Sequence, residues 1–63
     1  MSEELIKLLA KKKVENQKLE IADKQNNLFL CLAIMDTLNE IDEKIRAIAT
    51  EKEIEELHIK GLI

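Results

Sequence analysis

The most informative segment for the fold is Leu28-Phe29-Leu30-Cys31-Leu32-Ala33-Ile34-Met35, because its eight residues follow one another without a charged or strongly polar side chain. No glycine or proline interrupts it, and leucine, methionine and alanine favour helices. A helix through this segment is apolar on every side, whereas a two-helix hairpin covers only one side of each helix. We therefore expect the segment to bring two copies of the chain together.

The composition of the whole chain favours the same structural class. The 63 residues are 46% hydrophobic and 37% charged, with one aromatic residue, one glycine and no proline. Such a composition is typical of long amphipathic helices and leaves little material for strands or tight turns. The sequence predicts an all-α fold with a single domain over residues 1–63, and it excludes a glycine-rich phosphate loop.

Apolar residues recur every three or four positions in both halves of the chain. The first half has the stripe Ile6, Ala10, Val14, Gln17 and Ile21, and the second has Leu38, Ile41, Ile45 and Ile48. The heptad spacing changes phase between the halves, so a helical hairpin explains the pattern better than one long helix. The residues expected in the core and dimer interface are Val14, Ile21, Leu28, Cys31, Met35, Leu38, Ile41, Ile45 and Ile48.

The ends of the two expected helices carry recognisable signals. Ser2 is a plausible N-cap and Gly61 a plausible C-terminal stop. Two sites compete for the turn between the helices: the polar cluster around Gln25-Asn27, and the capping-box pattern Thr37-Leu38-Asn39-Glu40 beside Asp36. We favour the turn near Asp36-Thr37, because a capping box has a defined hydrogen-bonding mechanism. Two such hairpins packed face to face would form an antiparallel four-helix bundle.

Few residues offer chemistry beyond packing. Glu55 and His58 form a Glu-x-x-His pair, which di-iron bundles use, but the chain has ten glutamates and one such pair is unremarkable. Cys31 lies among apolar residues with no base beside it, so we expect a packed thiol rather than a nucleophile. No catalytic set or nucleotide motif is present. We expect no enzyme, no metal site and no cofactor.

Charged residues divide between the two halves of the chain. Lys7, Lys11, Lys12, Lys13 and Lys18 lie in the first half, whereas most acids lie in the second. Because no aromatic residue accompanies these lysines, we favour charge pairing or protein docking over nucleic-acid binding. The candidate docking residues for an unidentified protein partner are Lys11, Lys12, Lys13, Glu51, Glu53 and Glu56. A nucleic-acid-binding regulator remains the alternative.

Charge and hydropathy also bear on localisation. The acidic start Met1-Ser2-Glu3-Glu4 lacks the positive charge of a signal peptide. The longest uncharged run, Gln25 to Met35, has 11 residues, whereas a membrane span needs about 20. The net charge of −3 is too small to indicate a nucleic-acid binder. We expect an intracellular protein, in the host cytoplasm if it is viral, without membrane contact.

The two apolar arms, around Leu28–Met35 and Leu38–Ile48, together with the bias toward lysine, glutamate and isoleucine, resemble the Rop-like four-helix-bundle proteins. More narrowly, they resemble small proteins of fuselloviruses, the spindle-shaped viruses of hyperthermophilic archaea. The resemblance implies a homodimer of two hairpins and an adaptor role in macromolecular or virion assembly. RNA-binding Rop proteins expose a phenylalanine on their first helix. No phenylalanine precedes Phe29 here, so RNA binding is not carried over.

Overall fold

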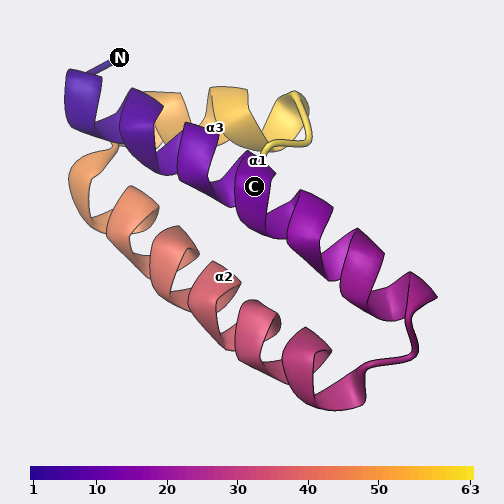
Figure 1. Ribbon diagram of the computed structural model, residues 1–63. Coiled ribbons are helices and arrows are strands. Elements are labelled where there is room, and N and C mark those ends of the chain that lie inside the picture. The colour runs from indigo at the N-terminus through magenta and orange to yellow at the C-terminus, as the bar shows by residue number, and fades with distance from the viewer.

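The computed structural model describes residues 1–63 and contains three helices and no strands. Helix α1 spans Glu3–Lys24, α2 spans Leu28–Ile48 and α3 spans Glu51–Ile59. Helices α1 and α2 lie antiparallel as a hairpin, and α3 turns back beside the N-terminal half of α1 (Figure 1). The molecule is elongated, with extents of 37 × 18 × 16 Å. The predicted all-α class is confirmed, with two packed helices that form the hairpin.

Helix α1 begins where the sequence predicted. The hydroxyl of Ser2 accepts a hydrogen bond from the backbone N–H of Leu5 at 3.1 Å. This bond satisfies one of the N–H groups that the first turn of a helix leaves without a partner. Glu3 and Glu4 lie in the same turn, where the helix dipole favours negative charge.

The turn between α1 and α2 lies at residues 25–27, the site that we did not favour from the sequence. Asn26 adopts the left-handed conformation (φ 54°), which asparagine tolerates better than most residues. The backbone N–H of Asn27 donates to the carbonyl of Ala22 at 3.0 Å, as in a Schellman motif. The Asn27 side chain then accepts a hydrogen bond from the Leu30 N–H at 3.2 Å and caps α2. Two asparagines thus end one helix and begin the next.

The favoured turn at Asp36-Thr37 is wrong, because α2 continues through it. The Thr37 hydroxyl donates a hydrogen bond to the carbonyl of Ala33 at 3.2 Å, a bond that threonines make inside helices. A stripe of buried residues from Ile34 to Ile45 crosses this position at unbroken helical spacing. A turn there would expose part of that stripe, and its burial outweighs the capping-box pattern.

A third helix, which we did not predict from the sequence, follows a break at Ala49. The backbone N–H of Thr50 donates to the Glu53 carboxylate at 3.0 Å, and the Glu53 N–H donates to the Thr50 hydroxyl at 3.2 Å. This reciprocal pair is a capping box, and it begins α3. The Thr-x-x-Glu pattern therefore forms a helix start at Thr50 and none at Thr37.

Gly61 ends α3 as the sequence predicted. Its φ of 72° lies in the left-handed region, where a side chain would be strained. The backbone N–H of Leu62 donates to the carbonyl of Leu57 at 2.9 Å, so a second Schellman motif reverses the chain. Leu62 is thereby placed beside α1.

The core consists of two clusters at opposite ends of the hairpin. The first contains Leu5, Ile41, Ile45 and Leu57, with Leu8, Leu9, Ala49 and Ile63 packed against it. The second contains Ala22, Ile34 and Leu38, with Leu19 and Cys31 packed against it. Between the clusters the Lys12 ammonium lies 2.8 Å from the Asp42 carboxylate. Helix α3 contributes one buried residue, Leu57, so it covers only the end of the hairpin that lies far from the turn.

Candidate functional site

The residues predicted for the core and dimer interface divide into two groups. Leu38, Ile41 and Ile45 are buried within the single chain, and Cys31 is half-buried. The exposed members are Val14, Ile21, Leu28, Met35 and Ile48. These five side chains lie in solvent in a single copy, so they are free to contact another chain. Their contact with a second copy stays a prediction.

Helix α1 carries apolar residues on two opposite sides. The side that packs against the rest of the chain comprises Leu5, Leu8, Leu9, Leu19 and Ala22. The other side, here named the outer stripe, comprises the apolar residues Ile6, Ala10, Val14 and Ile21 together with the polar Gln17. With about 3.6 residues per turn, the two sets lie about half a turn apart. Ile6, Val14 and Ile21 are 55%, 48% and 57% exposed, so the outer stripe has no partner in the chain.

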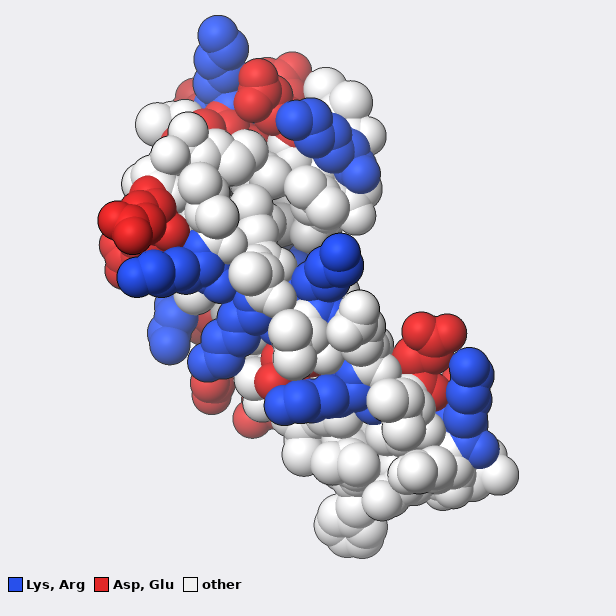
Figure 2. Space-filling model, turned by 45° about the horizontal axis from the view of Figure 1, so that its top comes forward, with Lys and Arg blue, Asp and Glu red and all other residues white.

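A second uncovered surface, with apolar and polar side chains in its lining, lies between α1 and α2 near the hairpin turn, and we name it the tip groove. It has a volume of about 410 Å³ and is lined by Asn16, Leu19, Glu20, Asp23, Cys31 and Met35. Leu28 and Leu32, near Met35 on α2, are 74% and 60% exposed. The lower end of the molecule in Figure 2, which is the hairpin end, shows a broad surface without charged side chains. None of the three helices combines the length and apolar character that crossing a membrane requires.

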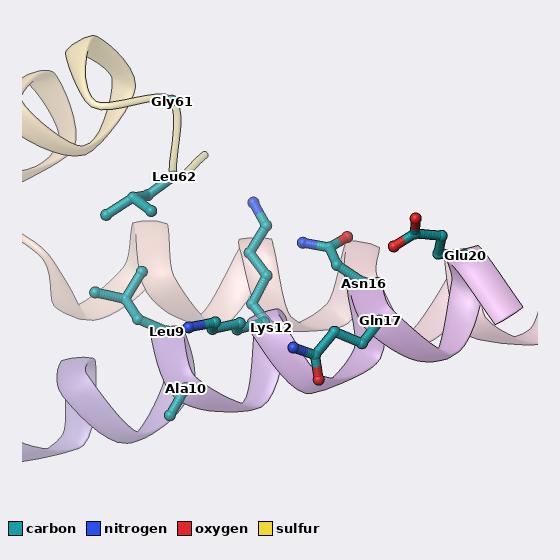
Figure 3. A pocket seen from close by; sticks show the side chains of 9 residues that line it. Leu9, Ala10, Lys12, Asn16, Gln17, Glu20, Gly61 and Leu62 are labelled. Atoms are coloured by element: carbon teal, nitrogen blue, oxygen red, sulfur yellow. The ribbon is translucent and has the colours of Figure 1, made fainter.

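A larger groove of about 790 Å³ lies between α1 and the turn that follows α3. Figure 3 shows Leu9 and Leu62 at one end of this groove and Asn16, Gln17 and Glu20 along α1. Small-molecule sites orient their ligands with a few fixed polar groups. The side chains of Asn16 and Gln17 have no hydrogen-bond partner in the chain that would fix them. Lys12, which also lines the groove, is held by its ion pair with Asp42.

The candidate docking residues differ in what they contact. Lys12 pairs with Asp42 of α2, and its side chain is only 14% exposed. Glu53 accepts the capping-box hydrogen bonds and lies 3.9 Å from the N-terminal ammonium. Lys12 and Glu53 therefore belong to the fold. The exposed members without an ion pair in the chain are Lys11, Lys13, Glu51 and Glu56. These four stay candidates for docking.

The capping box of α3 makes the fold sensitive to acid. The backbone N–H of Thr50, and then its hydroxyl and the N-terminal charge, hold the pKa of the Glu53 carboxyl below its ordinary value of 4.5. A carboxyl with a lowered folded pKa stabilises the fold above its ordinary pKa, and this contribution is lost as the pH falls through the lowered value. We expect α3 to fray in that range, as measured by hydrogen exchange of the Glu53 amide. The variant Glu53→Gln should not show this acid-induced loss of amide protection. The same loss in the variant would show that another group causes it.

The Glu-x-x-His pair lies on the surface of α3. Glu55 and His58 are both exposed. No group of three histidine, cysteine, aspartate or glutamate side chains in the chain is placed to hold a metal ion. The pair therefore has no further ligands within one copy.

Comparison of the chain with protein-family models, with curated proteins and with solved structures found no match. Its function must therefore be inferred from its own surfaces. Those that the fold leaves without a partner include the outer stripe of α1, the tip groove and the unpaired charges beside them.

Proposed function

We propose that this protein is a non-enzymatic adaptor, a structural interaction protein that works as a homodimer in macromolecular assembly. The observation that carries the proposal is the tip groove, beside which Leu28, Leu32 and Met35 are at least half exposed. Contiguous apolar surface of this kind marks a site for another protein, since leaving it in water is unfavourable. A hairpin that offers apolar surface and no catalytic set acts by contact.

The proposed dimer joins two hairpins through their tip grooves. Helix α3 covers only the far end of each hairpin, so the tip halves can overlap while both α3 helices stay outside. Four helix segments then enclose Leu19, Cys31 and Met35 from both copies as an antiparallel four-helix bundle. The resemblance to Rop-like proteins and to small fusellovirus proteins supports this arrangement and a role in viral assembly.

Substitution of Met35 by Glu tests the proposed dimer. Met35 is 50% exposed in one copy, so the change should leave the hairpin folded. In the dimer it would bury a carboxylate without a partner, and we expect the dissociation constant to rise about 100-fold. Sedimentation equilibrium gives the mass, and circular dichroism gives the helix content. The matched control is Ile59→Glu, at a 78% exposed position of α3 outside the groove, which should leave the mass unchanged.

A dimer that survives Met35→Glu with an unchanged dissociation constant would contradict the tip-groove interface. Loss of helix content together with the dimer would show that folding requires association. In that case Met35→Ala, which removes apolar area without adding charge, should weaken the dimer while the helices persist.

Nucleic-acid binding is the second candidate function, favoured by one observation. Lys7, Lys11 and Lys13 are exposed on α1 and have no ion-pair partner in the chain. Unpaired lysines on one helix can contact phosphates, and such binding weakens steeply with salt. Phe29, the only aromatic residue, lies on α2 rather than beside these lysines. Stem-loop RNA that binds at low salt and is released at high salt would favour this candidate.

A further inference from the structure

The two edges of the hairpin carry opposite unpaired charges. On the α1 edge the outer stripe is exposed, and Lys7, Lys11 and Lys13 flank it without an ion pair in the chain. Lys7 and Lys11 border one side of the stripe and Lys13 borders the other. The α1 edge is therefore an apolar strip with a basic border.

The α2 edge has the complementary pattern. Phe29 is 90% exposed at the start of α2, and Asp36, Glu40 and Glu43 follow it at helical spacing. None of the three carboxylates has an ion-pair partner in the chain. Phe29 and these acids lie on the side of α2 opposite its buried stripe, so they face away from α1. An exposed phenylalanine beside three unpaired acids is an unusual surface for a chain without a partner.

We propose that the α1 edge of one copy packs against the α2 edge of another, with the two helices antiparallel. At about 1.5 Å per residue, Ile21 to Lys13 spans about 12 Å and Phe29 to Asp36 about 10.5 Å. From Lys13 to Lys7 is about 9 Å, and from Asp36 to Glu43 about 10.5 Å. Placing Ile21 on Phe29 therefore brings the three lysines opposite the three acids. This inference rests on the proposed self-association and adds a second contact to it.

Pairing like edges is less favourable. Two α1 edges would place the lysines of both copies along one interface, and two α2 edges would do the same with the acids. Unlike edges pair opposite charges and cover Phe29 together with Ile21. Charge complementarity thus selects a second copy of this chain as the occupant of the α1 edge.

The position of the edges determines the form of the assembly. The α1 edge and the α2 edge lie on opposite sides of the hairpin, so one contact leaves an unused edge on each copy. A head-to-tail contact of this kind adds further copies, which form either a closed ring or an open row. The tip-groove dimer uses a different surface, so edge contacts would link dimers into larger assemblies. This gives a structural adaptor a means of lateral growth.

Charge reversal of each edge tests the proposal. The acidic-edge variant carries Lys7→Glu, Lys11→Glu and Lys13→Glu, and the basic-edge variant carries Asp36→Lys, Glu40→Lys and Glu43→Lys. The control variant, Lys44→Glu with Lys52→Glu and Lys60→Glu, makes the same change in net charge as the acidic-edge variant, but at exposed positions outside both edges. All the substituted side chains are exposed and unpaired, so circular dichroism should show native helix content in each variant.

Sedimentation velocity at low salt measures the edge contact. We expect the wild-type protein and the control to form species larger than two copies as concentration rises, and salt to reverse this growth. Each edge variant alone should lose about tenfold or more in the association constant for growth beyond the dimer. An equal mixture of the two edge variants should regain growth, because each supplies the charge that the other lacks.

Three results would overturn the edge contact: a wild-type protein that never exceeds two copies, edge variants that grow undiminished, or growth that requires added RNA. The first leaves the tip-groove dimer standing, so the two proposals fail separately. If Met35→Glu has no effect while the mixture still restores growth, the tip-groove dimer fails and the edge contact holds.

Discussion

Replacement of Ile45 by Asp is expected to unfold the protein. Ile45 is fully buried in the first core cluster, where Leu5 of α1, Ile41 of α2 and Leu57 of α3 meet. A carboxylate there has no partner, and an uncompensated buried charge costs several kcal/mol. Small domains have about 5 kcal/mol of stability or somewhat more, so this single change removes most of it. Loss of the helical signal in circular dichroism, and of any dimer in sedimentation, would show the effect.

Two control substitutions separate burial from the loss of isoleucine as such. Ile45→Val keeps an apolar side chain and should cost about 1 kcal/mol, leaving the fold intact. Ala47→Asp adds the same carboxylate at an exposed position of α2 and should preserve the helix content. A folded Ile45→Asp variant with wild-type thermal stability would contradict the proposed core.

Replacement of Leu57 by Ala should release α3 from the hairpin. Leu57 is fully buried and is the single buried residue of its helix. Removing a buried leucine costs about 2–5 kcal/mol, and the capping box alone holds α3 only weakly. We expect the α3 amides to lose protection in hydrogen exchange, and the apolar side chains of Leu5 and Ile45 to become exposed. The α1 and α2 amides near the hairpin turn should keep more of their protection, because the second cluster does not include Leu57.

The matched control for Leu57→Ala is Ile59→Ala, since Ile59 lies in the same helix and is 78% exposed. That change should leave the protection of α3 unchanged. Equal loss of protection in both variants would mean that α3 is held by its local helical stability and not by its contact with the hairpin.

The helix ends show which structural features local sequence patterns can predict. Ser2 and Gly61 act as predicted, because the bonds that they support involve only a few neighbouring residues. The pattern Thr-x-x-Glu occurs at both Thr37 and Thr50, and only Thr50 begins a helix. At Thr37 the apolar spacing continues from Ile34 to Leu38, and at Thr50 no buried residue follows until Leu57. The spacing of buried residues across each pattern is the signal that separates the two.

The two apolar sides of α1 explain why the candidate surface was only partly predictable. The outer stripe is the more regular of the two patterns in the sequence, so its spacing predicts that it is the inner side. The inner side contains Lys12 between Leu9 and Leu19, and a lysine interrupts an apolar pattern. Asp42 of α2 neutralises that lysine at 2.8 Å, a contact that depends on the turn at residues 25–27. The periodicity of the sequence reveals both apolar sides of α1. Only the contact between α1 and α2 shows which side is buried.

Val14, Ile21, Leu28 and Met35 are exposed in a single copy, and the proposed self-association of the chain would cover them. Sedimentation equilibrium of the wild-type protein at micromolar concentration shows whether the chain associates with copies of itself. Self-association predicts a folded species of at least two 7.3 kDa chains. A folded species of a single 7.3 kDa chain, with full helix content at the same concentration, would contradict it.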